Sequence, residues 1–267
     1  MPIVCEFYQA MTKLNFPRLF VDRPRLAHGL RYLDIGKLSN IRVSSRLQHI
    51  TKSSAECQVT TYNTTPSVYH DEATVHVFAL APGDLEFLTG EYMHSLWMNP
   101  DDPGAVRIDF ERPFVTPPKV VVFFNCIDLD KNYNWRLKTT ATDIDVNGFT
   151  LHVGTWSDTV LYAARVGWIA YPEDREHIFS TSVSTLDLRP ANMPQHTHHK
   201  DISFNSVKFL KQPSAFIALN SLDMDCKASV RIHAHIDGVS MTGLVWHIDS
   251  WADSVLYSAG ASIIVFT

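Results

Sequence analysis

The stretch DLDKNYNWRLKTTATDIDVNGFTLHVGTWSDTVLY, residues 128–162, decides the fold because its pattern occurs three times in the chain. Its markers are Asp128, an arginine eight positions later (Arg136), and a large aromatic residue twenty positions after the arginine (Trp156). The same ungapped spacing gives two further copies, with Asp34, Arg42 and Tyr62 in the first and Asp223, Arg231 and Trp251 in the third. The arginines follow one another at intervals of 94 and 95 residues, so the repeated unit has the size of a domain.

The repeat divides the 267 residues into three expected domains, 1–81, 82–172 and 173–267. Hydrophobic residues make up 45% and charged residues 19% of the chain, so it can build a packed core. The formal net charge of −5 argues against a nucleic-acid partner, which favours a basic surface. No apolar run reaches the ~18 residues that a membrane-spanning helix needs.

The beginning of the chain and its cysteines bear on the compartment. Residues 1–11 carry Glu6 and Gln9 and lack the basic and apolar regions of a classical signal peptide. The four cysteines stand at unrelated positions of the repeat, namely Cys5, Cys57, Cys126 and Cys226. This spacing favours free thiols in a reducing compartment over a repeated disulfide framework. We therefore expect a cytoplasmic protein, or one released by a non-classical route.

The residues around each marker arginine alternate with period two. Trp135 and Leu137 face one side of the predicted strand, whereas Arg136 and Lys138 face the other. After a turn at 147–148, the next strand places Trp156 on the same polar side as the arginine. Alternation with one apolar face is typical of antiparallel strands that cover a core. Because no helical period appears, the pattern predicts an all-β protein of three tandem antiparallel β-sandwiches.

Two connectors separate the units, 81–106 and 172–200, and both contain prolines. Each also contains an apolar pair, Phe87-Leu88 or Ile178-Phe179, which favours an additional edge strand. Much less chain precedes Phe16, which leaves room for a first unit without this leading strand.

An exposed arginine beside an exposed aromatic ring, with Tyr162 six positions beyond Trp156, is typical of a sugar site. An arginine donates paired hydrogen bonds to neighbouring hydroxyl groups. A tryptophan or tyrosine ring offers a flat apolar surface to the C–H face of a sugar, worth about 1 kcal/mol by analogy with aromatic pairs. The alternative is a half-buried tryptophan that caps the sandwich and an arginine bound to a neighbouring acid. Three copies with matching faces favour the site.

The quoted motifs resemble an H-type lectin domain, the family of the snail agglutinins and of the C-terminal domain of discoidins. The resemblance rests on 110–118, 134–136, 148–149, 155–162 and 168–170, extends well over 204–266, and is looser over 16–80. It implies a six-stranded antiparallel sandwich that assembles as a trimer. It also implies calcium-independent binding of galactose or N-acetylgalactosamine near the boundaries between protomers.

Carried over to this chain, the resemblance assigns sugar contacts to eleven residues. They are Arg136, Trp156, Ser157 and Tyr162 in the second unit, Arg231, Trp251 and Tyr257 in the third, and Arg42, Tyr62, Asn63 and Tyr69 in the first. Two departures predict unequal sites, because Ala252 follows Trp251 and Tyr62 replaces a tryptophan. The acidic contact of the family is hard to place, since 101–104 resembles an agglutinin loop but Val106 stands where an aspartate is expected.

Three such domains in one chain predict an intramolecular pseudo-trimer, monomeric as a chain, with sugar sites between different units. Further dimerisation stays open, as do roles in agglutination, cell adhesion or defence. The second class of function is a protein-interaction or structural scaffold whose sugar sites have degenerated. Ala252 and the divergent first unit favour the scaffold, and the set Arg136, Trp156 and Tyr162 favours the lectin.

Other groupings point to no catalytic or metal function. The cluster at 196–199 holds three histidines that could bind a metal, but a solvated linker patch is favoured. The acid pairs at 128 and 130 and at 223 and 225 are interpreted as strand-end turn acids rather than cation ligands. No phosphate loop, catalytic triad or repeated pair of convergent carboxylates is present. We therefore expect neither an enzyme nor a bound cofactor or metal.

Overall fold

The computed structural model describes residues 10–61, 71–96, 98, 104–205 and 207–267. In this part of the chain the first unit contributes β1 (Ala10–Asn15), β2 (Arg25–Ile35), β3 (Ile41–Gln48), β4 (Ser54–Thr61) and β5 (Glu72–Leu80). The second contributes β6 (Leu88–Ser95), β7 (Ala105–Asp109), β8 (Lys119–Leu129), β9 (Trp135–Thr142), β10 (Gly148–Gly154) and β11 (Leu161–Tyr171). The third contributes β12 (Ile178–Ser184), the 3-10 turn η1 (Thr185–Asp187), β13 (His199–Ser203), β14 (Ser214–Met224), β15 (Val230–Asp237), β16 (Gly243–Asp249) and β17 (Leu256–Phe266).

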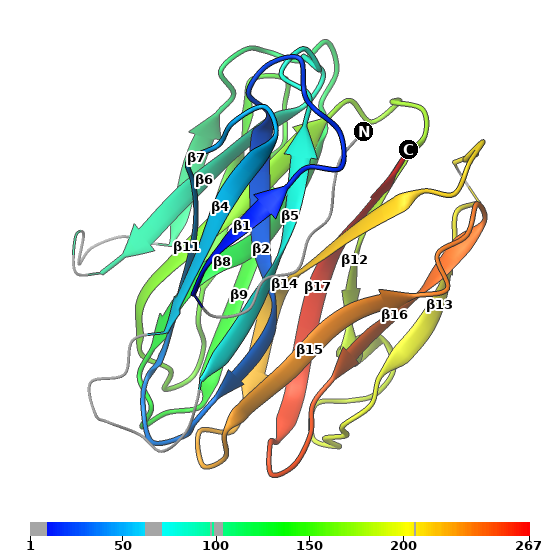
Figure 1. Ribbon diagram of the computed structural model, residues 1–267. Coiled ribbons are helices and arrows are strands. Elements are labelled where there is room, and N and C mark those ends of the chain that lie inside the picture. The colour runs from blue at the N-terminus through cyan, green and yellow to red at the C-terminus, as the bar shows by residue number, and fades with distance from the viewer. Residues whose placement is uncertain (1–9, 62–70, 97, 99–103, 206) are drawn as a thin grey trace.

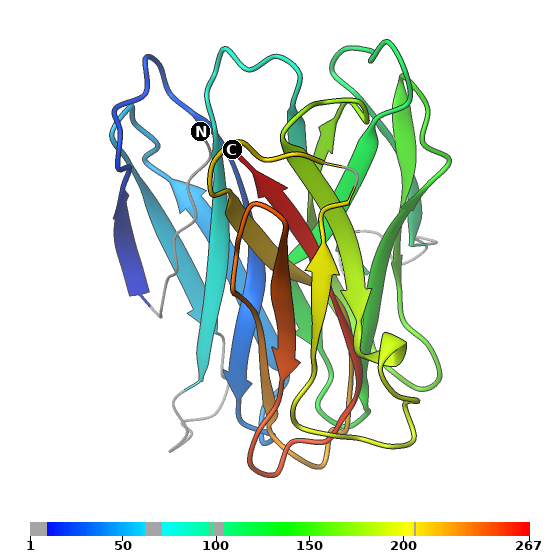
Figure 2. The ribbon, with the colours of Figure 1, turned by 90° about the vertical axis from the view of Figure 1, so that its right-hand side faces the viewer.

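The strands run roughly along the long axis of the molecule and pack as layers (Figures 1 and 2). Within the second unit, β6, β11 and β8 form one half of a sandwich, and β7, β10 and β9 form the other half. The third unit repeats this with β12, β17 and β14 against β13, β16 and β15, which Figure 1 shows in yellow-green to red. All recorded pairings are antiparallel. The predicted all-β class is therefore confirmed. None of the described helices is long and apolar enough to cross a membrane.

The connectors contain the expected edge strands. β6 pairs with β11 and β12 pairs with β17, so each extends its sheet by one strand. In the first unit β5 stands at the corresponding edge, and the described residues offer no strand to cover it. The sheet that contains β5 consequently has five strands, whereas the other two sheets have six.

Each sheet is shared by two units, which closes the chain into a ring. The strand that carries a marker arginine pairs with the first long strand of the next unit: β3 with β8, β9 with β14, and β15 with β2. The sheet orders are β1-β4-β3-β8-β11-β6, β12-β17-β14-β9-β10-β7 and β13-β16-β15-β2-β5. Three interlocked sandwiches in one chain form the expected pseudo-trimer. The units meet through backbone hydrogen bonds rather than through flexible linkers.

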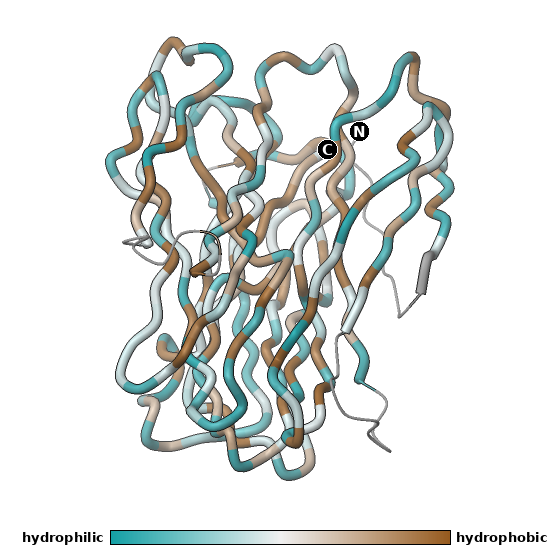
Figure 3. Tube along the Cα trace, turned by 90° about the vertical axis from the view of Figure 1, so that its left-hand side faces the viewer, coloured by the Kyte–Doolittle hydropathy of each residue, from teal (hydrophilic) through white to brown (hydrophobic). Residues whose placement is uncertain are grey.

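The long apolar strands are buried on both faces because two cores meet them. In β8, Val122 and Phe124 point into the core of the sandwiches, whereas Val121 and Phe123 point into a second core at the centre of the ring. Figure 3 shows how hydrophobic residues recur along the inner strands. The continuous apolar sequence at 120–124 follows from this double burial.

The central core is built around one phenylalanine from each unit, namely Phe78, Phe123 and Phe216. The ring centroids lie 5.0 Å apart for Phe123 and Phe216 and 6.0 Å apart for Phe78 and Phe216. Such edge-on and tilted contacts are the arrangement that aromatic rings prefer. A Cβ atom at Gly167 would stand 2.6 Å from the Phe123 ring, so this close approach requires glycine.

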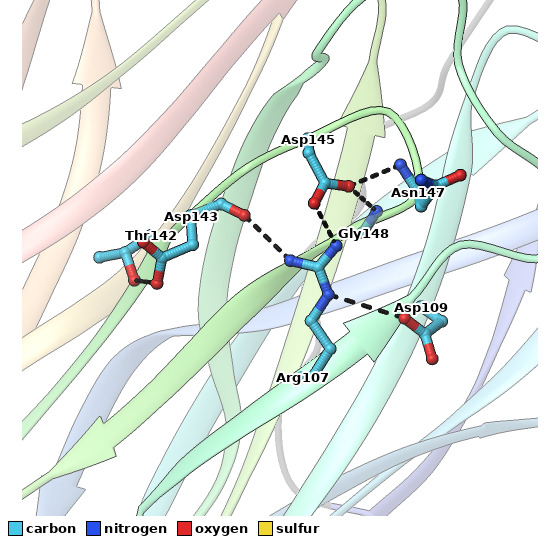
Figure 4. A network of polar contacts seen from close by, with 7 residues as sticks. All are labelled: Arg107, Asp109, Thr142, Asp143, Asp145, Asn147 and Gly148. Atoms are coloured by element: carbon cyan, nitrogen blue, oxygen red, sulfur yellow. Dashed lines mark hydrogen bonds and ion pairs between the residues drawn. The ribbon is translucent and has the colours of Figure 1, made fainter.

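In each unit, the turn between the strand of the marker arginine and the strand that follows it is held by a side-chain oxygen at the same position of the repeat. Asp145 Oδ1 accepts hydrogen bonds from the backbone N–H groups of Asn147 (2.7 Å) and Gly148 (3.0 Å), as Figure 4 shows. In the second unit Arg107 of β7 also donates to Asp145 Oδ2 at 2.6 Å and to the Asp143 carbonyl at 3.0 Å. Thr51 and Ser240 hold the corresponding turns of the other units in the same way. These local bonds set the register of the strands on either side.

The cysteines that the structure describes, Cys57, Cys126 and Cys226, are free thiols, as the sequence favoured. Burial raises the pKa of Cys57 to about 12, so this thiol is unreactive. Cys5 lies outside the described residues.

Candidate functional site

The marker arginine of each unit forms an ion pair with the marker aspartate of the next unit. The distances from Nε to Oδ1 are 3.0 Å for Arg42 and Asp128, 3.5 Å for Arg136 and Asp223, and 3.2 Å for Arg231 and Asp34. Each pair stands directly opposite across the strands that join the two units. We call these places junction 1–2, junction 2–3 and junction 3–1.

The arginines are less exposed than the alternating pattern predicted. Their side chains are 27% (Arg42), 15% (Arg136) and 13% (Arg231) exposed. The prediction of a wet face was wrong in this respect, because the polar face of one unit is partly covered where the next unit joins it. A single unit cannot reveal this, since the partner aspartates lie in another unit, 86, 87 and 197 positions away in the sequence.

Burial also shifts the pKa values of the aspartates at the junctions. It raises the pKa of Asp223, and the nearby charge of Arg136 lowers that pKa only in part. Burial likewise raises the pKa of Asp128, against the hydrogen bond and charge of Arg42. A half-buried carboxylate depends on its arginine, so the ion pairs couple one unit to the next.

A second carboxylate reaches two of the arginines from the loop that follows the marker tryptophan. Arg136 Nη1 donates to Asp158 Oδ1 at 2.5 Å, and Arg231 Nη1 donates to Asp253 Oδ1. The hydrogen bond from Arg231 lowers the pKa of Asp253. The sequence analysis missed these partners, although both aspartates stand two positions after the tryptophan of their copy.

The tyrosines lie with the arginine of the preceding unit. Tyr162 Oη donates to Asp130 Oδ2 at 2.6 Å, and the guanidinium of Arg42 lies over the Tyr162 ring, 5.9 Å from its centroid. In the third unit Tyr257 Oη donates to Asp225 Oδ2 at 3.0 Å. Burial and this hydrogen bond raise the pKa of Tyr257, whereas the charge of Arg136 acts in the opposite direction. The tyrosines therefore do not share a junction with the arginines of their own units, although the sequence analysis expected them to do so. Tyr162 belongs to junction 1–2 and Tyr257 to junction 2–3.

Junction 2–3 presents an open aromatic surface beside a fixed arginine. Trp156 is 39% exposed, and Ser157 after it is exposed with φ of 61°. The loop is held because Thr159 Oγ1 donates to the carbonyl of Asn134 at 2.6 Å. Among the described residues, Nη2 of Arg136 has no hydrogen-bond partner. The junction thus offers a free donor group, carboxylate acceptors and an exposed indole in one place.

Junction 3–1 has the same arginine arrangement but a covered tryptophan. Trp251 stacks on Tyr32 of the first unit, with ring centroids 5.4 Å apart and an angle of 27° between the planes. Tyr32 in turn meets His233 edge-on at 5.5 Å. Ala252 adopts φ of 57°, close to the backbone of Ser157, but it has no hydroxyl group. The ring of Tyr32 therefore covers one face of this indole, and Trp251 is half-buried.

Junction 1–2 is only partly described. Arg42, Asp128, Asp130 and Tyr162 are in place, and Asn40 Oδ1 accepts a hydrogen bond from the Lys131 N–H at 3.1 Å. The other residues assigned to the first unit, Tyr62, Asn63 and Tyr69, lie outside the described residues, as does the acidic loop at 101–103.

The interpretation of the histidine cluster at 196–199 as a solvated linker patch was wrong for His198, whereas His196 and His199 are exposed. His198 is buried, accepts a hydrogen bond from Arg189 Nε at 2.7 Å, and contacts the Ile248 carbonyl through Nδ1 at 2.8 Å. His199 lies in β13, and His196 contacts the Ser250 hydroxyl at 3.0 Å. The segment forms part of the sandwich because it runs beside β16 as an edge strand.

Comparison with known proteins assigns the repeats to a family. The family model of the H-type lectin domain matches residues 11–70, 105–171 and 199–266, which is more than half of the chain. A curated relative from Fuscovulum blasticum, described as "ATP synthase subunits region ORF 7", is 33% identical over 76 residues. The match covers 28% of this chain and 66% of that relative, so the chain spans just under two thirds of the relative's length.

Proposed function

Because the chain belongs to the H-type lectin family, we propose that it binds galactose- or N-acetylgalactosamine-type glycans at the junctions between its units. A carbohydrate-binding role follows from the family, and three copies of the domain give the chain several places for it. The proposal adds the sugar class, independence from calcium, and junction 2–3 as the principal site.

The observation that carries the proposal is the exposed Trp156 in the loop whose Asp158 pairs with Arg136 at junction 2–3. Ion pairs with Asp158 and Asp223 hold the guanidinium in place, so it is oriented before a ligand arrives. Its free Nη2 group can donate to a sugar hydroxyl, and the hydroxyls can donate to the neighbouring carboxylates. The indole supplies the apolar surface for the C–H face of the ring.

The proposed binding needs no calcium, because the arginine and carboxylate groups can form hydrogen bonds with the sugar hydroxyls directly. A glycan array probed with the purified chain, with calcium and with a chelator, tests both the sugar class and calcium independence. We expect the same galactose-type ligands in both conditions, with signals weakened in Trp156→Ala and kept in Trp251→Ala. Binding that requires calcium, or binding by Trp156→Ala as strong as that of the wild type, would contradict the proposal.

A scaffold without sugar binding is the second candidate, and one observation favours it. At junction 3–1 the stack of Trp251 on Tyr32 uses the aromatic surface for contact between units. If all junctions served only to join units, the array would show no ligand for the folded wild-type chain. A folded chain without glycan ligands would therefore favour the scaffold.

A further inference from the structure

A row of stacked histidine rings crosses the third unit beside junction 3–1. The centroids are 5.5 Å apart for His199 and His247, 4.4 Å for His247 and His235, and 4.5 Å for His235 and His233. The planes of His235 and His247 differ by only 6°. At its end the row meets Tyr32 of the first unit through His233.

The strand register places these side chains on one face. His199, His247 and His235 stand opposite one another on the neighbouring strands β13, β16 and β15. Asp237 follows His235 by two positions, so it points to the same face of β15. This face is opposite to the sandwich core, which takes up Ile232 and Ala234.

Three of the groups bring donor atoms together. Asp237 Oδ2 lies 3.4 Å from His247 Nε2 and 3.8 Å from His235 Nε2. One donor atom from each of His235, Asp237 and His247 lies within 4.8 Å of the other two. Two imidazoles and a carboxylate are a ligand set typical of zinc and related transition metals, whereas calcium and magnesium prefer oxygen alone.

We propose that His235, His247 and Asp237 form a site for a divalent transition-metal ion of the zinc class, with water as the remaining ligand. Ligands about 2.1 Å from a tetrahedral zinc ion are separated by about 3.4 Å. The carboxylate already meets this spacing with His247, and small side-chain rotations bring His235 into place. The ion links β15 to β16 on the face that continues into junction 3–1.

The contrast with His198 shows that His235 is not a structural histidine of the ordinary kind. Both ring nitrogens of His198 have partners, one in Arg189 and one in the Ile248 carbonyl. His235 Nδ1 is buried and has no hydrogen-bond partner among the described residues. The other ring nitrogen, Nε2, faces Asp237 Oδ2 at 3.8 Å, and this is the atom that the site uses.

The other units lack the set, although they share the strands. The positions of His235, Asp237 and His247 are occupied by Thr140, Thr142 and His152 in the second unit and by Arg46, Gln48 and Gln58 in the first. In the second unit the lone histidine is satisfied locally, since Thr142 Oγ1 lies 2.8 Å from His152 Nε2. The site is therefore specific to the third unit and independent of the sugar proposal.

Calorimetric titration of the metal-free chain with zinc chloride tests the site. We expect one ion per chain, with affinity reduced about 100-fold in His235→Thr and in His247→Gln, because each imidazole supplies a large part of the binding. These substitutions copy residues that the same strands carry in the other units, so the sheet tolerates them. Asp237→Asn should weaken binding about tenfold.

Two controls separate this site from the other histidines. His152→Ala, the matched variant in the second unit, should bind zinc as the wild type does. The double variant His196→Ala and His199→Ala should also keep the ion, as read by calorimetry and by the visible absorption of cobalt(II) in place of zinc. No binding to the wild type, loss of the ion in this double variant, or unchanged binding in His235→Thr would overturn the proposal.

Discussion

Junctions 2–3 and 3–1 share an arginine between two carboxylates but differ in what their tryptophan touches. Trp156 is exposed, whereas Trp251 stacks on Tyr32. The repeat position of Tyr32 holds Cys126 in the second unit and Ser221 in the third, so only junction 3–1 provides an aromatic partner there. Three units in one chain can diverge in this way, which three identical chains around a symmetry axis cannot do.

The ion pairs at both junctions give the largest expected effect. Arg136→Ala and Arg231→Ala should each lower the free energy of unfolding by about 2 kcal/mol, because each leaves a half-buried aspartate without its cation. Partial exposure of the pairs keeps the effect below that of a fully buried pair. Urea denaturation measures it. Arg107→Ala is the control, since its ion pairs are more exposed and should contribute less than the junction pairs. Equal losses in all three variants would show that the junction arginines do not couple the units.

Removing each tryptophan separates the two roles. Trp156→Ala should reduce affinity for an N-acetylgalactosamine ligand about tenfold, because the apolar surface for the sugar is lost. Trp251→Ala should leave affinity unchanged and lower stability by about 1 to 2 kcal/mol, since its ring packs on Tyr32. Calorimetry and thermal unfolding of both variants measure these outcomes. Lost affinity in Trp251→Ala together with lost stability in Trp156→Ala would contradict the roles assigned to the two tryptophans.

Removing the ring of Tyr32 should make junction 3–1 resemble junction 2–3. Tyr32→Ser copies Ser221, so it exposes the indole of Trp251 beside Arg231. We expect the number of sugar molecules bound per chain to rise by one, with the new site weaker because Ala252 lacks a hydroxyl. The double variant with Ala252→Ser should bind more tightly at that site. An unchanged stoichiometry in calorimetry would show that coverage by Tyr32 is not what distinguishes the junctions.

The smallest expected difference lies in the titration of the carboxylates. Burial raises the pKa of Asp223, so the ionised form of this group destabilises the folded state. The destabilisation is absent at pH values below the unfolded pKa and develops as the pH rises through the folded pKa. Arg231 lowers the pKa of Asp253, so that group stabilises the fold above its unfolded pKa and ceases to do so as pH falls through its folded pKa. Carbon NMR of the carboxyl groups between pH 2 and 7, limits set by usual aspartate values of about 4, should place Asp223 above Asp253. The opposite order would contradict the assigned environments.

Much of the architecture follows from the sequence because the signal is local. The alternation at 135–142, the turn at 147–148 and the apolar run at 120–124 each predict a strand or turn from neighbours in the chain. The three-fold repetition and the resemblance supply the number of units and their closure into a ring. Pairing of β3 with β8 could not be derived in detail, since register between units depends on long-range packing.

The composition of the site was harder to predict for the same reason. Arg136 and Tyr162 are close in the sequence pattern but lie at different junctions, because each tyrosine faces the preceding unit. The stack of Trp251 on Tyr32 joins residues more than two hundred positions apart, and nothing near Trp251 reveals its partner. Asp158 and Asp253 were available as a repeated signal two positions after each tryptophan and could have been found.

The difference between the two tryptophans can be measured directly by fluorine NMR of the chain labelled with 5-fluorotryptophan. The chain has six tryptophans, and Trp156→Phe and Trp251→Phe assign the two resonances of interest. During titration with N-acetylgalactosamine, the resonance of Trp156 should shift and saturate while that of Trp251 stays in place. A shift of Trp251 with Trp156 unmoved, or no shift of either in the folded chain, would contradict the assignment of sugar binding to junction 2–3.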